Sequence, residues 1–207
     1  MKSTLLDIPG TALAVIFGSL LYYFGGAPYL ALMLIFLLAS VLVTKYEHQE
    51  KRKMGIYEHE RSWENVLANG IVPLFAAILS PAIGFGAFVG SIAAITADKF
   101  ASELGVLSGE PYSIFGFKRV KRGTSGAVSP FGTLMSFDGA LLIAIAVYFL
   151  FPGIDAWRVL LISLIGFSGS LIDTVFGVLE EEGIGSKATT NLICALTGAL
   201  LGYFLLI

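Results

Sequence analysis

The chain has 207 residues, of which 56% are hydrophobic and only 14% are charged, and its mean hydropathy is +0.84. A soluble domain carries about 25% charged residues, so this composition excludes an ordinary soluble protein and indicates an integral membrane protein. The net charge of −2 points to no charged partner, and we expect no nucleic acid. The single cysteine, Cys194, excludes an intrachain disulfide and a cysteine-ligated metal cluster.

Seven hydrophobic segments are long enough to cross a bilayer as helices, which takes about 17–25 residues each. Their predicted bounds are 6–24, 27–44, 64–80, 83–104, 128–150, 157–178 and 188–206. The polar stretches between them are too short to fold alone, so residues 1–207 are predicted to form one domain. The predicted fold class is all-α, a polytopic transmembrane helix bundle of about seven spanning helices.

Local signals place the ends of these segments. Pro9 suits the first turn of the first helix. Tight turns are predicted at 25–28, 80–81 and 151–153, where glycine and proline interrupt the hydrophobic pattern. A cleaved signal peptide is the alternative for the first segment, but Lys2 is its only basic flank and no clear cleavage site follows.

Lysine and arginine gather on one side of the predicted bundle. The N-terminus and the loops 45–63, 105–127 and 179–187 hold eleven of the 13 basic residues, whereas only Arg158 falls on the opposite side. Because cytoplasmic loops carry the excess of Lys and Arg, we expect the N-terminus and these loops in the cytoplasm. The C-terminus is then expected outside.

The loop 45–63 is the longest polar stretch and mixes both signs of charge. This pattern predicts a solvated or surface-lying helix, with Tyr46, Tyr57 and Trp63 as anchors at the membrane interface. Control of access to a lipid site is the alternative role for this loop.

Four carboxylates stand near the inward ends of two hydrophobic segments. Asp98 and Glu103 end the fourth segment, and Asp173 and Glu180 end the sixth. Burying a charge near hydrocarbon costs several kcal/mol unless the charge is paired, hydrated or bound to metal, so these groups indicate chemistry or transport. Asp98 shares a helix face with Ser102, four residues on, and Asp173 shares one with Glu180, seven residues on. Oxygen ligands on converging helices suit Mg²⁺, which predicts these four carboxylates as metal ligands.

A cluster of four basic residues at 118–122 precedes a loop of small residues, Gly-Thr-Ser-Gly at 123–126, and a helix follows. The glycines let backbone N–H groups turn toward an anion, and the helix N-terminus adds partial positive charge. The order predicts a phosphate site formed by Lys121, Arg122 and the backbone amides of the loop. A charged flank with a simple helix cap is the alternative. The loop is not a Walker A motif, because its basic residues precede the glycines.

Three further acids receive other interpretations. Asp138 lies about ten residues into the fifth predicted helix, where an acid indicates function, a pair with Lys99 or a bond to a neighbouring helix. Glu181 and Glu182 are interpreted as ordinary helix-end carboxylates that touch lipid headgroups.

At these motifs the chain resembles the phytyl-phosphate kinase and transmembrane-protein-19 family, from about Arg61 to its end. The resemblance lies in the run at 61–70, in Thr-Ala-Asp at 96–98 with Ala-Ser-Glu-Leu-Gly at 101–105, and in Gly-Thr-Ser-Gly-Ala-Val-Ser at 123–129. Gly-Ser and Asp-Thr within 169–174 add a fourth similarity. Together these runs are specific, although each one alone is weak.

The resemblance implies a membrane-embedded isoprenoid-phosphate kinase. Such an enzyme moves the terminal phosphoryl group of a nucleoside triphosphate, CTP by expectation, to a prenyl monophosphate such as phytyl or geranylgeranyl phosphate. With Mg²⁺ as cofactor, we expect catalytic roles for Asp98, Glu103, Asp173 and Lys121. The residues expected to bind the nucleotide and its phosphates are Asn69, Ser102, Arg122, Gly123, Thr124, Ser125, Gly126, Ser129 and Asn191. The expected partners are the prenyl-phosphate lipid, the nucleotide and membrane lipid. The sequence is also compatible with a homo-oligomer.

Two other functions fit the same residues. Cytidylyl transfer would give a CDP-lipid and release pyrophosphate. An ion-coupled transporter would also use acids on helices and an anion site at a helix end. A carrier needs a site at mid-membrane that both sides can reach, whereas the polar residues here are predicted to gather at one face.

Overall fold

The computed structural model describes residues 6–56 and 62–206. Lys2, Tyr57 and Arg61, which entered the predictions as a basic flank, an interface anchor and the start of the resemblance, lie outside these ranges. The long helices are α1 (Ile8–Gly25), α2 (Ala27–Lys45), α4 (Trp63–Ile83), α5 (Gly86–Gly105), α6 (Pro130–Leu150), α7 (Ala156–Glu181) and α8 (Lys187–Leu205). The short elements are α3 (His48–Lys53), β1 (Tyr112–Ser113) and β2 (Ala127–Val128), the two strands pairing antiparallel.

The predicted all-α membrane bundle is confirmed. Six of the long helices in the described ranges are long and apolar enough to cross a membrane. The seventh, α5, corresponds to the predicted segment 83–104 and carries Asp98, Lys99 and Glu103 in its second half. Bulky apolar side chains such as Leu42, Phe149 and Phe204 are exposed, which suits an outer surface in contact with lipid.

The turns predicted at 25–28 and 151–153 are confirmed, but the turn at 80–81 is wrong. Helix α4 continues through Pro81 to Ile83 and ends at Gly84, whose φ of 77° favours glycine. Proline removes the N–H that would bond to the carbonyl of Ala77. The Ser80 hydroxyl donates to that carbonyl at 2.8 Å instead, which explains how the helix tolerates the proline.

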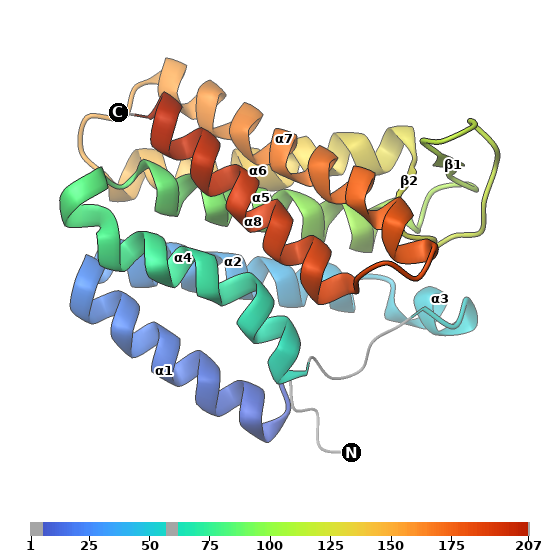
Figure 1. Cartoon of the computed structure of the whole chain (residues 1–207), viewed down its shortest axis with the longest axis horizontal. Coiled ribbons are helices and arrows are strands. Elements are labelled where there is room, and N and C mark those ends of the chain that lie inside the picture. Colours follow the sequence, from blue (N-terminus) through green and yellow to red (C-terminus); the bar gives the residue numbers. More distant parts are fainter. Residues whose placement is uncertain (1–5, 57–61, 207) are drawn as a thin grey trace.

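Successive long helices alternate in direction, so the polar connections collect at one end of the bundle (Figure 1). The start of α1, the helix α3, the strands β1 and β2 and the α7–α8 connection lie at this end, whereas α8 ends at the opposite one. Helix α5 occupies the centre and makes its most extensive contacts with α6, α7 and α8. Helix α1 packs mainly on α4 and α2 at the edge.

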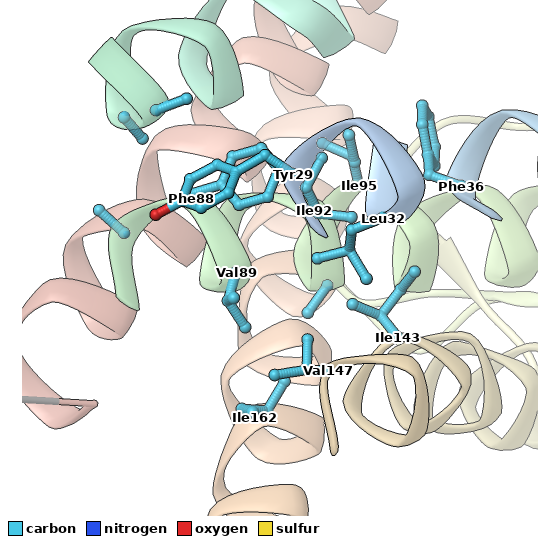
Figure 2. Packing of buried hydrophobic residues seen from close by; sticks show 14 of the residues in the cluster. Tyr29, Leu32, Phe36, Phe88, Val89, Ile92, Ile95, Ile143, Val147 and Ile162 are labelled. Atoms are coloured by element: carbon cyan, nitrogen blue, oxygen red, sulfur yellow. The ribbon is translucent and has the colours of Figure 1, made fainter. Parts of the chain in front are cut away.

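The core lies where α2 and α6 meet α5. Figure 2 shows Tyr29 and Leu32 of α2 facing the α5 side chains, and the Tyr29 ring stacks on Phe88 with centroids 4.4 Å apart. Ile143 of α6 and Ile162 of α7 are fully buried on the other side. Because lipid is as apolar as these side chains, close packing rather than release of water holds the helices together.

Glycine brings α5 and α8 into backbone contact. A Cβ atom at Gly90 would overlap the carbonyl oxygen of Gly198, and one at Gly202 would overlap the carbonyl oxygen of Gly86. Small residues at helix crossings let main chains approach closely in membranes. This contact fixes α8 against the central helix, and with it the residues that both helices present at the polar end.

We expect Gly90→Ala to destabilise the fold by about 1–3 kcal/mol, because the added methyl group has no space against α8. Thermal unfolding of the purified protein in detergent should show a melting temperature several degrees lower. Gly109→Ala is the matched control, since a Cβ at Gly109 meets no atom within 4 Å in the described structure. Equal losses from both variants would contradict the close contact.

Candidate functional site

A cavity of about 640 Å³ opens at the polar end of the bundle. It contains most of the residues predicted to form a site, although they come from four helices and from the stretch 123–129 before α6. The predicted residues that line it are Asn69, Asp98, Ser102, Glu103, Gly123, Thr124, Ser125, Gly126, Ser129, Asp173, Glu180 and Asn191. Lys121 and Arg122 do not line it; both are exposed, and the Arg122 guanidinium lies 3.5 Å from the sulfur of Met54.

Asp98 of α5 and Asp173 of α7 share one ammonium group. The Nζ atom of Lys187, at the start of α8, lies 3.0 Å from Oδ2 of Asp173 and 4.0 Å from Oδ2 of Asp98. The Asp173 side chain is only 7% exposed and the Asp98 side chain 11%, whereas the Lys187 side chain is 42% exposed. The two acids thus converge inside the protein, as predicted, and both line the cavity.

Among the described residues, three oxygen atoms in the cavity wall lack a hydrogen-bond partner, and one of them is the Ser136 hydroxyl. Within the described ranges, Oδ1 of Asp173 and Oδ1 of Asn191 are buried without any hydrogen bond. An unsatisfied buried polar atom is costly, and such atoms cluster where a ligand or ion binds. Carboxylate and amide oxygens are hard ligands that suit Mg²⁺. The atoms present therefore fit a divalent ion held by Asp98 and Asp173, and Asn191 lines the same cavity. The described residues contain no group of three or more Asp, Glu, His or Cys side chains arranged to hold a metal.

Glu103 is held by partners of its own. Its carboxylate pairs with Lys51 at 2.9 Å and with Lys99 at 2.6 Å, and it accepts a hydrogen bond from the Thr44 hydroxyl at 2.9 Å. These contacts use both carboxylate oxygens. Glu103 therefore holds α2, α3 and α5 together in the wall of the cavity and has no oxygen left over for an ion. Glu180 accepts a hydrogen bond from Thr190 at 3.4 Å and links α7 to α8.

The loop 45–63 departs from the prediction of a solvated or surface helix at Lys51. Helix α3 has only six residues, and the Lys51 side chain is 1% exposed. Its ammonium donates to the carbonyl oxygens of Val43 and Thr44, at 2.7 and 3.3 Å, in addition to pairing with Glu103. A lysine that caps the last carbonyls of a helix satisfies groups that have no intrahelical partner. The part of the loop up to Ile56 therefore folds inward and forms part of the cavity wall, with Gly55 and Ile56 lining it.

The glycine loop at 123–126 lies directly against α7. A Cβ at Gly177 would meet the backbone nitrogen of Gly126 at 2.6 Å, so only glycine fits at this contact. The backbone N–H of Ser125 donates to the Glu181 carboxylate at 2.7 Å. One backbone N–H of this loop therefore already donates to an acid of the protein, and the phosphate site predicted for the loop stays a prediction. Ser129, rather than Thr124 or Ser125, caps α6 by accepting from Gly132 N–H at 3.0 Å.

Three residues of the site were missed by the sequence interpretation. Lys187 and Lys51 counted only as basic flanks, and Glu181 was interpreted as a carboxylate that touches headgroups. The position of Lys187 at a helix start facing two intramembrane acids was the available signal, since such acids require a counter-charge. Asp138 is half-buried on α6 and does not line the cavity.

The lining of the cavity also includes apolar side chains of α1, α2 and α4, and we call this part of the lining the apolar arm. Phe17 and Gly18 of α1, Met33 and Leu37 of α2 and Gly70 of α4 line this part. The cavity thus joins charged groups at one end to hydrocarbon side chains at the other, which is the shape of a site for an amphiphile.

Comparisons with known proteins agree with a membrane role. Over 207 residues, the chain is 41% identical to an uncharacterized membrane protein of Methanocaldococcus jannaschii, covering 97% of this chain and 86% of that protein. It is 30% identical to the Arabidopsis thaliana protein called Protein PGR, covering 85% of this chain and 72% of that protein. An uncharacterized membrane protein of Synechocystis is 33% identical over 60% of this chain and 52% of its own length.

No solved structure gives a significant match. The family model described as integral membrane protein DUF92 matches residues 1–199, which is nearly the whole chain. The resemblance to phytyl-phosphate kinases is not named by any of these matches and stays a prediction. The chain is therefore a multi-pass integral membrane protein that belongs to the DUF92 family.

Proposed function

We propose that this protein transfers the γ-phosphoryl group of a nucleoside triphosphate, CTP by preference, to a prenyl monophosphate, giving the prenyl diphosphate. The observation that carries the proposal is one cavity that joins the Asp98–Asp173 pair, the glycine loop and an apolar arm. A lipid phosphate needs this combination, because its head must meet charges while its tail stays among hydrocarbon groups.

The proposed chemistry needs little from the protein beyond positioning and charge neutralisation. A terminal oxygen of the prenyl phosphate attacks the γ-phosphorus, and the bond from that phosphorus to the oxygen bridging to the β-phosphate breaks. The nucleoside diphosphate leaves with the bond electrons. A phosphate monoester is already mostly ionised near neutral pH, so no strong general base is required. His48, the histidine that lies within the described ranges, does not line the cavity, which fits this requirement.

The residues of the cavity take separate roles in this proposal. Asp98 and Asp173 would hold Mg²⁺, whose bound form supplies positive charge to the phosphate oxygens. The start of α6 and the glycine amides of the 123–126 loop would bind phosphate oxygens, since the Thr124 and Ser125 amides already have acceptors in the protein, and Ser129 would hold that helix start in place. Glu103 would position the wall and Glu180 would hold α7 to α8. Lys121 and Arg122 would attract anionic substrates from outside the cavity rather than contact the transferred group.

The proposed site faces the cytoplasm. The support is the excess of Lys and Arg in loops 45–63, 105–127 and 179–187, together with the gathering of these loops at one end of the bundle (Figure 1). On this orientation nucleotide reaches the polar end from the cytosol, and the lipid lies with its tail in the apolar arm.

Two alternatives remain for the same cavity. Cytidylyl transfer would also use paired acids, a metal ion and a lipid phosphate, and only the products separate it from a kinase. An ion-coupled transporter is less well supported, because the charged lining residues Asp98, Asp173 and Lys187 gather toward one end of the bundle.

The test is product analysis with the purified protein. We expect incubation with Mg²⁺, CTP or ATP, and phytyl or geranylgeranyl phosphate to give prenyl diphosphate and a nucleoside diphosphate, identified by mass spectrometry. Pyrophosphate with a CDP-lipid would establish the cytidylyltransferase instead. Solute flux into liposomes without nucleotide, with no product formed, would establish a carrier and overturn the kinase.

A further inference from the structure

We propose that the Asp98–Asp173 pair is a cation-exchange site, in which Lys187 is the resident cation and leaves when a divalent ion binds. The released ammonium then serves as an additional ligand for an anion in the same cavity. This inference rests on the proposed function for two points: that the entering cation is divalent, and that an anion binds in the same cavity.

The side-chain exposures identify Lys187 as the partner that can move. Asp98 and Asp173 are buried on the packed helices α5 and α7, whereas the Lys187 side chain is 42% exposed at the first position of α8. Lysine holds a compact charge on a flexible four-carbon stem, so its ammonium can shift by several ångströms without movement of the backbone. The carboxylates can therefore stay in place while their counter-ion changes.

The ammonium leaves oxygen ligands unused. Its nitrogen lies 3.0 Å from one oxygen of Asp173. The distance to Oδ2 of Asp98 is 4.0 Å, which is long for an ion pair. Oδ1 of Asp173 and Oδ1 of Asn191 find no partner in the described structure, and both residues line the cavity. A lysine–carboxylate pair that never changed would leave these buried acceptor oxygens without a hydrogen-bond donor. A divalent ion prefers several oxygen ligands at once, and the unpartnered atoms supply them.

The charge balance favours exchange. When both carboxylates are ionised, the pair and one ammonium together carry a net charge of −1, which repels a phosphate. A divalent ion in place of the ammonium neutralises the pair, and the displaced ammonium adds a positive charge where the anion binds. The nearby Lys99 does not take this role, because it pairs with Glu103 at 2.6 Å. Metal and anion are therefore expected to bind cooperatively through one lysine.

Metal affinity without nucleotide tests this inference. Mn²⁺ alone is titrated into purified protein and free Mn²⁺ is followed by electron paramagnetic resonance. We expect Lys187→Met to bind Mn²⁺ at least about threefold more tightly than the wild type, because the competing cation is gone. Lys187→Arg, which keeps a positive charge, should bind no more tightly than the wild type. Lys118→Met, at an exposed position outside the cavity, is the control and should not change the affinity.

A second measurement uses the wild-type protein and so does not depend on the folding of a variant. Saturating Mn²⁺ should raise the reactivity of Lys187 toward an amine-labelling reagent, read by peptide mass spectrometry, while Lys118 stays unchanged. Unchanged or weaker Mn²⁺ binding by a folded Lys187→Met, or a Lys187 reactivity that Mn²⁺ does not raise, would overturn the exchange.

The two proposals fail separately. Tighter Mn²⁺ binding by Lys187→Met in a protein that forms no prenyl diphosphate would keep the exchange site and remove the kinase. Prenyl diphosphate formation by a wild type whose Lys187 does not respond to Mn²⁺ would do the reverse.

Discussion

Asp173→Asn and Asp98→Asn should each lower the kcat of the proposed phosphoryl transfer by at least about tenfold, which corresponds to about 1.4 kcal/mol of transition-state stabilisation. Each substitution keeps the shape of the side chain but removes one negative charge from the cavity. A neutral amide then replaces a carboxylate, which is a stronger ligand for a divalent ion. Turnover at saturating nucleotide and lipid, measured as prenyl diphosphate formed per minute, is the readout.

The matched control is Glu182→Gln, which neutralises an exposed acid close to the end of α7 that does not line the cavity. Its rate should equal that of the wild type. The Mn²⁺ affinity of the Asp98 and Asp173 variants should fall in parallel with their turnover. Wild-type rates from both folded Asn variants would remove the metal assignment, and a matching loss in the Glu182 variant would point to a general effect of charge.

The second large effect is expected on stability. Lys51→Met should lower the free energy of unfolding by about 3 kcal/mol, because it breaks a buried ion pair with Glu103 and removes the donor to two buried helix-end carbonyls. Lys51 is 1% exposed, and it contacts Glu103 and two carbonyl oxygens of α2. The loss should appear as a lower melting temperature of the detergent-solubilised protein.

Lys53→Met provides the comparison on the same short helix. Lys53 is 71% exposed, and its partner Glu50, 2.6 Å away, raises the pKa of its ammonium above the ordinary value. A pair so open to solvent contributes little to stability, so the melting temperature should not change measurably. If both variants melted at the wild-type temperature, Lys51 would not hold α3 against the bundle.

The helices were predictable from the sequence because hydrophobic length alone sets how many times a chain can cross a bilayer. The convergence of Asp98 with Asp173 was also predictable, since helices that run in the same direction bring their ends to one face. The continuation of α4 past Pro81 was not, because it depends on the hydroxyl of Ser80 bonding to Ala77. Sequence patterns carry no information on such a local substitution of donors.

The pairing of each charge was also beyond the sequence. Lys51 and Glu103 are far apart along the chain, and their contact depends on how α3 folds back under α2. Lys187 looked like any basic residue that flanks a span. Its role in the structure follows from the position of α8 against α5, which the glycine contacts determine. The approach of the two acids on α5 and α7 was therefore predictable, whereas the lysines from α3 and α8 that pair with the buried acids were not.

The backbone contact between α5 and α8 also bears on how the protein would respond to membranes of different thickness. Helices adjust to a thicker or thinner bilayer by tilting, at a cost of fractions of a kcal/mol per ångström of mismatch. Because main-chain atoms meet at Gly90 and Gly198, these two helices can tilt only as one rigid body. The separation of the α5 and α8 backbones at Asp98 and Lys187 is thereby kept constant, while α1, which packs at the edge, is free to adapt.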